Sequence, residues 1–154
     1  MKQYIGTKIV QAEFAYRIDF GHGEYAYAGE GDIITSPGHI EGGYRVRYED
    51  GYTSWSPLAA FEKAYRLTDG MSFGLAIEAA KMGKKIARSG WNGKSQYVEL
   101  ATCISYKNAD GCEINAEHQS IGNKALAFVG TSGVQMGWLA SQADMLADDW
   151  YIVE

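Results

Sequence analysis

The chain has 154 residues, of which 46% are hydrophobic and 13% aromatic, so it can form one domain or two small ones and is too apolar for a disordered protein. Its formal net charge of −5 argues against general binding to duplex nucleic acid, which requires a basic face. A small anionic ligand is not excluded, because only the local field at its site matters.

The N-terminus and the two cysteines indicate the cellular compartment in which the protein is expected. The first residues lack the apolar segment of a signal peptide, and no apolar run approaches the ~18 residues of a membrane-spanning helix. Cys103 and Cys112 flank a turn at residues 108–111 and could face each other on a hairpin, but nothing else suggests an oxidising compartment. We therefore expect a cytoplasmic protein that has no membrane partner.

Residues 1–67 predict a small α+β module of unknown role. A strand-like run covers residues 8–14. The stretch from 21 to 43 is rich in glycine and turn residues, which is typical of an irregular loop. A module of this size is too small to be stable without docking on something.

The clearest hairpin signal follows that loop. Tyrosine and valine alternate with arginine at residues 44–48, Asp50-Gly51 turns the chain, and residues 52–55 return. Ser56 is then placed as a helix N-cap, with Pro57 at the first helical position.

Residues 70–154 predict a second α+β module, after a boundary at residues 68–70. Ser72 is placed to cap a helix whose alanine-rich face allows close approach to a sheet or to another subunit, and Gly83 is placed to end that helix. The other predicted elements are strands at residues 84–89, 96–100, 125–129 and 134–138, a short helix begun by a capping box of Ser141 and Asp144, and a last strand at 150–153. The fold class is α+β, with antiparallel sheets and short helices in two small modules.

A glycine-flanked loop at residues 88–94 carries one indole, one amide and two cations. Gly90 and Gly93 permit unusual backbone conformations and close approach of a ligand. Between residues 79 and 98 there are five basic residues and no acidic one, a local positive island in an acidic chain. Trp91 has two interpretations that the residues leave open, because an indole either packs into a core or stacks on a base.

Catalytic groups are scarce. The three histidines are scattered, and none pairs with a cysteine or carboxylate at the spacing of metal ligands. Neither a phosphate-binding glycine loop nor a nucleophile-elbow serine is present. Asp148 and Asp149 are adjacent carboxylates that we interpret as a solvated helix end. No complete catalytic constellation can be assembled, and we expect no catalytic residue, metal or cofactor.

Two ordered blocks in the second module carry a family resemblance. The first comprises residues 71–76, 83–88 and 90–94, and the second comprises residues 138–150. Together they resemble the phage family of Thoeris anti-defence sponge proteins of the second type, over residues 70–154. Residues 1–67 resemble an N-terminal extension found on many phage members of that family.

The resemblance implies a homotetramer without catalytic activity, acting in the cytoplasm of an infected bacterium. Such a protein binds cyclic ADP-ribose isomers made by bacterial TIR-domain enzymes and holds them away from the immune effector. Some members are similar in binding the cyclic oligonucleotides of CBASS defence. An anionic cyclic nucleotide requires stacking, polar edges and phosphate neutralisation, all of which the loop at 88–94 offers.

We expect the ligand site around this loop, between subunits. Trp91 would stack on a base and Asn92 would contact a ribose or base edge. The expected ligand-binding residues are Trp91, Asn92, Arg88, Phe73, Ser72, Lys94, Gln142 and Asp144. Of these, Arg88 and Lys94 would face phosphate, Ser72 and Phe73 would form a second wall at a helix start, and Asp144 has a competing role as a helix cap.

Two alternatives remain open at the level of sequence. The protein could be a hydrolase that degrades the same cyclic nucleotide signal. It could also be a phage interaction module without a small ligand, in which Trp91, Trp138 and Trp150 all belong to the core.

Overall fold

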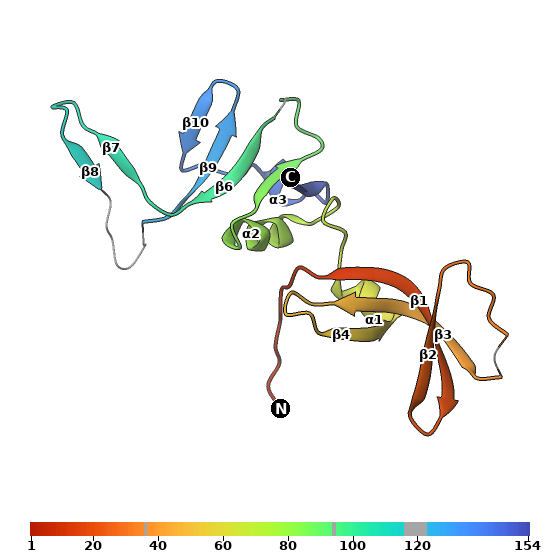
Figure 1. The fold of residues 1–154 in the computed structure, drawn as a ribbon. Coiled ribbons are helices and arrows are strands. Elements are labelled where there is room, and N and C mark those ends of the chain that lie inside the picture. The colour runs from red at the N-terminus through yellow and green to blue at the C-terminus, as the bar shows by residue number, and fades with distance from the viewer. Residues whose placement is uncertain (36, 94, 116–122) are drawn as a thin grey trace. The chain divides into compact units, whose positions relative to one another are not determined.

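The computed structural model describes residues 1–35, 37–93, 95–115 and 123–154. These residues form two compact units, Met1–Arg66 and Leu67–Glu154 (Figure 1). Both units combine antiparallel strands with short helices, so the predicted α+β class is confirmed. Among the described residues, no helix has the length and apolar character needed to span a bilayer.

The first unit is a four-stranded antiparallel sheet with one helix. Its strands have the order β2-β1-β3-β4. The elements are β1 (Gln11–Gly21), β2 (Glu24–Gly29), β3 (His39–Arg47), β4 (Thr53–Pro57) and α1 (Leu58–Ala64). One face of the sheet packs against α1 through aromatic rings, since Tyr44 in β3 stacks on Phe61 with ring centroids 4.2 Å apart.

Two local predictions for this unit are wrong. The stretch 21–43 is not an irregular loop, because it contains β2 and the start of β3. Its glycines mark two turns, one at residues 21–23, where all three residues have positive φ, and one after β2, where Gly31 has a φ of 89°. Ser56 does not cap α1, because it pairs with Tyr44 as part of β4, and Pro57 is the residue that precedes the helix.

The predicted hairpin through Asp50-Gly51 is confirmed, because β3 and β4 pair antiparallel across it and Gly51 has a φ of 85°. The strand expected at residues 8–14 begins three residues later and is longer than expected. Pairing with both β2 and β3 extends it to Gly21.

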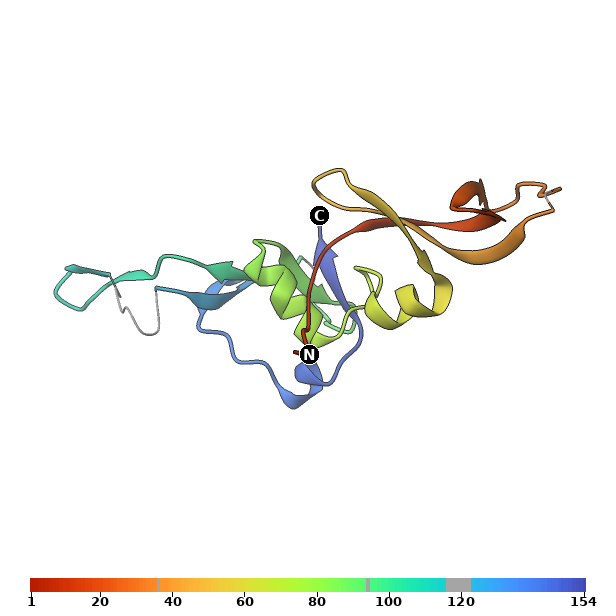
Figure 2. The same ribbon diagram turned by 90° about the horizontal axis from the view of Figure 1, so that it is seen from below.

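The second unit is built on a five-stranded antiparallel sheet. Its strand order is β10-β9-β6-β5-β11. The elements are α2 (Phe73–Lys81), β5 (Lys85–Arg88), β6 (Tyr97–Ala101), β7 (Ser105–Lys107), β8 (Glu113–Asn115), β9 (Ala125–Gly130), β10 (Gly133–Met136), α3 (Gln142–Met145) and β11 (Trp150–Val153). The β7–β8 hairpin forms a separate small sheet and extends away from the larger one in both views (Figures 1 and 2).

The core of the second unit lies between α2 and this sheet. Ala76, Ala79 and Ala80 are fully or almost fully buried in one cluster with Ile86 and Trp150. The small alanines allow α2 to approach its own sheet closely. The alanine face of α2 is therefore covered by the sheet, which is the first of the two alternatives that its small residues allowed.

Short-range signals predicted the ends of the helices in this unit correctly. Gly83 follows the C-cap of α2 with a φ of 85°. At α3, the Ser141 hydroxyl accepts from the Asp144 amide while the Asp144 carboxylate accepts from the Ser141 amide, which confirms the capping box. Cys103 and Cys112 are both free and exposed.

The sheet of the first unit contains a position that only glycine fits. A Cβ on Gly43 would collide with the Ser56 carbonyl oxygen and with the Trp55 ring. We expect Gly43→Ala to reduce the free energy of unfolding of this unit by about 1–3 kcal/mol through overpacking. Hydrogen exchange of the amides in β1 to β4 measures this change.

The neighbouring Gly42→Ala is the matched control, because its Cβ would make only ordinary contact with the Phe14 ring at 3.4 Å. Equal protection factors for the two variants would contradict the packing described for Gly43.

Candidate functional site

Trp91 lies in the loop between β5 and β6, at the margin of the core. It is partly buried and meets three other aromatic rings nearly perpendicularly, with centroid distances of 5.5 Å to Phe128, 6.0 Å to Trp138 and 5.3 Å to Trp150. Its indole N–H donates to the Asp144 carboxylate at 3.1 Å. Trp91 therefore has a packing role, and part of its side chain remains exposed.

Arg88, the last residue of β5, is held between two carboxylates. Its Nη1 donates to Asp144 at 2.9 Å and its Nε donates to Asp149 at 2.8 Å, while only 17% of its side chain is exposed. A further contact from Nη2 to Asp149 measures 3.5 Å. These three bonds leave at most two of the five N–H groups of a guanidinium for any other partner.

Asp149 has a structural role that the sequence did not indicate. Besides Arg88, it accepts hydrogen bonds from the Gly90 amide at 2.8 Å and from the Ser89 hydroxyl at 3.2 Å. The interpretation of Asp149 as part of a solvated helix end is therefore wrong. It holds the start of the Trp91 loop, because Trp150 pairs with Arg88 across β5 and β11 and brings Asp149 beside the loop.

The same network keeps both carboxylates charged. Burial alone would raise the pKa of Asp144, but hydrogen bonds from Ser141, Arg88 and Trp91 outweigh it and lower the pKa from 3.8 to about 2. The hydrogen bond from Arg88 also lowers the pKa of Asp149, against a smaller opposing effect of burial. In return, the bonds to Asp149 and Asp144 raise the pKa of Arg88.

The two loop glycines serve a purpose different from the one expected. Neither Gly90 nor Gly93 has positive φ, so neither is required for an unusual backbone conformation. A Cβ on Gly90 would lie 2.9 Å from Asp149, and one on Gly93 would collide with the Gln96 side chain. Other groups do approach both glycines closely, but among the described residues these groups are the side chains of Asp149 and Gln96.

The remaining expected site residues are distributed around this centre. Phe73 begins α2 and packs on Trp150 with centroids 5.5 Å apart, so it shares that neighbour with Trp91. Ser72 is the N-cap of α2 and makes no side-chain capping bond. Asn92 and Gln142 are exposed, whereas Lys94 lies outside the described residues.

The structure thus brings Arg88, Trp91 and Asp144 into direct contact and places Phe73 across the shared Trp150 ring. Sequence reasoning missed Asp149, Gln96 and Phe128 as neighbours of the loop. No local signal identifies Asp149 or Phe128, because Asp149 reaches the loop through the pairing of β5 with β11 and Phe128 through ring packing. Gln96 is a sequence neighbour of the loop. In the parts of the chain that the structure describes, no three metal-ligating side chains cluster.

The fold and the loop define a small α+β domain whose partly exposed tryptophan loop is held by ion pairs. A family model described as the Thoeris anti-defense 2-like domain matches residues 71–153, all within the second unit. Thoeris anti-defense 2 of Bacillus phage SP01 is 36% identical over 86 residues, covering 54% of this chain and 94% of that protein. The chain belongs to the Thoeris anti-defense 2-like family, as its resemblance predicted, and it is a phage anti-defence protein.

The lowered pKa of Asp144 predicts a loss of stability in acid. Because its folded-state pKa lies below 3.8, its stabilising effect is complete above that pH and is lost as the pH falls towards 2. The difference between the two pKa values of Asp144, 3.8 and about 2, corresponds to about 2 kcal/mol of unfolding free energy. We expect Asp144→Asn to flatten the dependence of unfolding free energy on pH in this range, as measured by urea titration at each pH.

The exposed Asp148→Asn is the control and is expected to retain the steep dependence of the wild type. A pH dependence unchanged in Asp144→Asn would show that this carboxylate is not held in its charged form by the network.

Proposed function

We propose that this protein binds a cyclic ADP-ribose isomer and sequesters it without cleavage, thereby depriving the Thoeris effector of its signal. Family membership supports the anti-defence role. The observation that carries the finer proposal is the loop itself, with a partly exposed indole at Trp91 beside the exposed amide of Asn92. These are the groups needed to stack on a base and to contact its edge or a ribose.

Electrostatics at the loop favour binding over catalysis. A general acid or base works best when its pKa lies near the operating pH. Asp144 has a pKa of about 2, and the pKa of Asp149 is also lowered while that of Arg88 is raised. All three groups therefore remain charged at neutral pH and are poorly suited to proton transfer.

The ion-pair network also changes the assignment of the phosphate contact. Arg88 is largely committed to Asp144 and Asp149, so its contribution to phosphate binding is small at most. The start of α2 is better suited, because the Ser72 side chain makes no capping bond and the first turn contains no acidic residue. We therefore propose that Ser72 and the amides after it face phosphate, together with Lys94.

A pocket shared between subunits would enclose such a ligand, which fits the proposed homotetramer. Since the alanine face of α2 is covered, the subunit contact is proposed at the sheet edge instead. β10 pairs with β9 and, among the described residues, has no strand on its other side. Val134 and Met136 on this strand are 63% and 46% exposed, which is unusual for an unpaired edge and suits burial against another copy.

Asn92→Ala tests the site without disturbing the core, because Asn92 is exposed. Loss of its hydrogen bonds is expected to weaken binding about three- to tenfold, with an unchanged melting temperature. Calorimetry against a panel of cyclic ADP-ribose isomers and cyclic oligonucleotides measures the affinity. Asn115→Ala, an exposed asparagine in the β7–β8 hairpin, is the control. Equal affinity of Asn92→Ala and the control would place the site elsewhere.

Sequestration also predicts that the ligand is recovered intact. After prolonged incubation with the protein and heat denaturation, chromatography with mass detection is expected to return the cyclic ligand in full yield at every time point. A linear or hydrolysed product that accumulates with time would instead establish the hydrolase alternative.

A further inference from the structure

In the first unit, β2 pairs with only part of β1. β1 pairs with β3 from Gln11 to Asp19, but it pairs with β2 only from Ala15 to Gly21. Residues 11–14 therefore have a strand on one side and, within the described parts of the chain, none on the other. Alternate residues of an antiparallel strand direct N–H and C=O groups to each side, so this segment presents unpaired backbone groups.

The end of β2 is fixed by a local turn. The Gly29 amide donates to the Asp32 carboxylate at 2.6 Å, and the Asp32 amide donates to the Gly29 carbonyl at 3.3 Å. The turn directs the chain away from the sheet at Gly29. The position beside residues 11–14, in line with β2, is consequently left without a strand.

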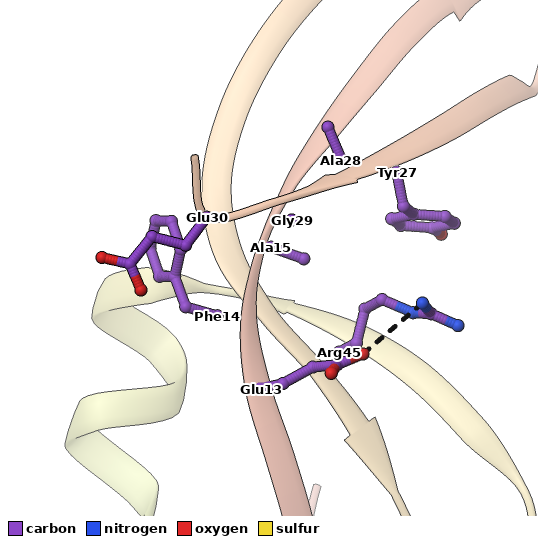
Figure 3. A pocket seen from close by; sticks show the side chains of 8 residues that line it. All are labelled: Glu13, Phe14, Ala15, Tyr27, Ala28, Gly29, Glu30 and Arg45. Atoms are coloured by element: carbon purple, nitrogen blue, oxygen red, sulfur yellow. Dashed lines mark ion pairs between the residues drawn. The ribbon is translucent and has the colours of Figure 1, made fainter. Parts of the chain in front are cut away.

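A cavity of about 320 Å³ lies at this position, which we call the notch. Ala15 and Gly29, which line it, are the last paired residues of β1 and β2, so the notch begins where that pairing ends. Figure 3 shows Phe14 and Glu30 on one side of β1, with Tyr27 and Arg45 on the other. The notch thus spans both faces of the sheet edge, as an added strand would.

The charges of the notch favour a basic occupant. Arg45 forms an ion pair with Glu13 at 3.5 Å, and 72% of the Glu13 side chain is exposed. Glu30 has no ion pair among those that the structure describes. One negative charge at the notch is therefore uncompensated.

We propose that the notch is a strand-addition site for an extended peptide segment that carries lysine or arginine. The peptide backbone pairs with residues 11–14 and continues the sheet beyond Gly29. Side chains of an extended strand alternate between faces, so a basic side chain on the Phe14 face reaches Glu30 while its neighbours lie beside Tyr27. This site is separate from the ligand loop of the second unit and does not depend on the function proposed for that loop.

Amide chemical shifts of the full ¹⁵N-labelled chain test this proposal. The probe is a blocked peptide of sequence Lys-Val-Lys-Val-Lys, compared with Glu-Val-Glu-Val-Glu and with the basic peptide methylated at every backbone nitrogen. We expect saturable shifts at residues 11–14 and 28–30 with the basic peptide only, because methylation removes the N–H donors that strand pairing requires.

Glu30→Lys is expected to weaken binding of the basic peptide about two- to fivefold, as for loss of an exposed ion pair. Glu24→Lys, at the opposite end of β2, is the charge-matched control and is expected to bind like the wild type. An unperturbed spectrum of each variant without peptide establishes that it is folded. Absence of saturable shifts at millimolar peptide, stronger binding of the acidic peptide, or equal binding of the methylated peptide would overturn the proposal.

Discussion

The guanidinium of Arg88 joins the middle of the second unit to two carboxylates that lie 56 and 61 positions later in the chain. It lies at the end of β5 and binds Asp144 in α3 and Asp149 immediately before β11. Without the cation, these two partly buried carboxylates would lie near each other uncompensated, which is unfavourable. Each carboxylate in turn holds the loop, since Asp144 accepts the Trp91 indole N–H and Asp149 accepts the Gly90 amide.

This arrangement separates residues that build the site from residues that are free to contact a ligand. Arg88, Asp144 and Asp149 fix the loop, whereas Asn92 in the loop and Gln142 at the start of α3 are exposed. A loop that is already fixed would lose little conformational entropy on binding a ligand, which suits the proposed function. Trp91 packs against the core and remains partly exposed, so its packing does not conflict with the proposed stacking.

Much of the second unit could be predicted from local patterns. Gly83, the Ser141–Asp144 capping box and the apolar run in β9 act over a few residues and gave nearly correct elements. The partners of Arg88 could not be predicted in this way. They depend on the pairing of β5 with β11, which brings Arg88 to Asp149, 61 positions later in the chain. In the first unit, β2 was missed because the glycines of its turn were taken to mark a longer loop.

We propose that the second unit binds an intact cyclic nucleotide at the Trp91 loop. The most direct measurement is the indole N–H spectrum of protein labelled at tryptophan nitrogen, recorded during titration with a cyclic ADP-ribose isomer. We expect the Trp91 resonance to shift saturably, the resonance of Trp55 in the first unit to stay unchanged, and the free ligand afterwards to show an unchanged phosphorus spectrum. Saturable binding that leaves the Trp91 resonance unchanged would contradict this proposal.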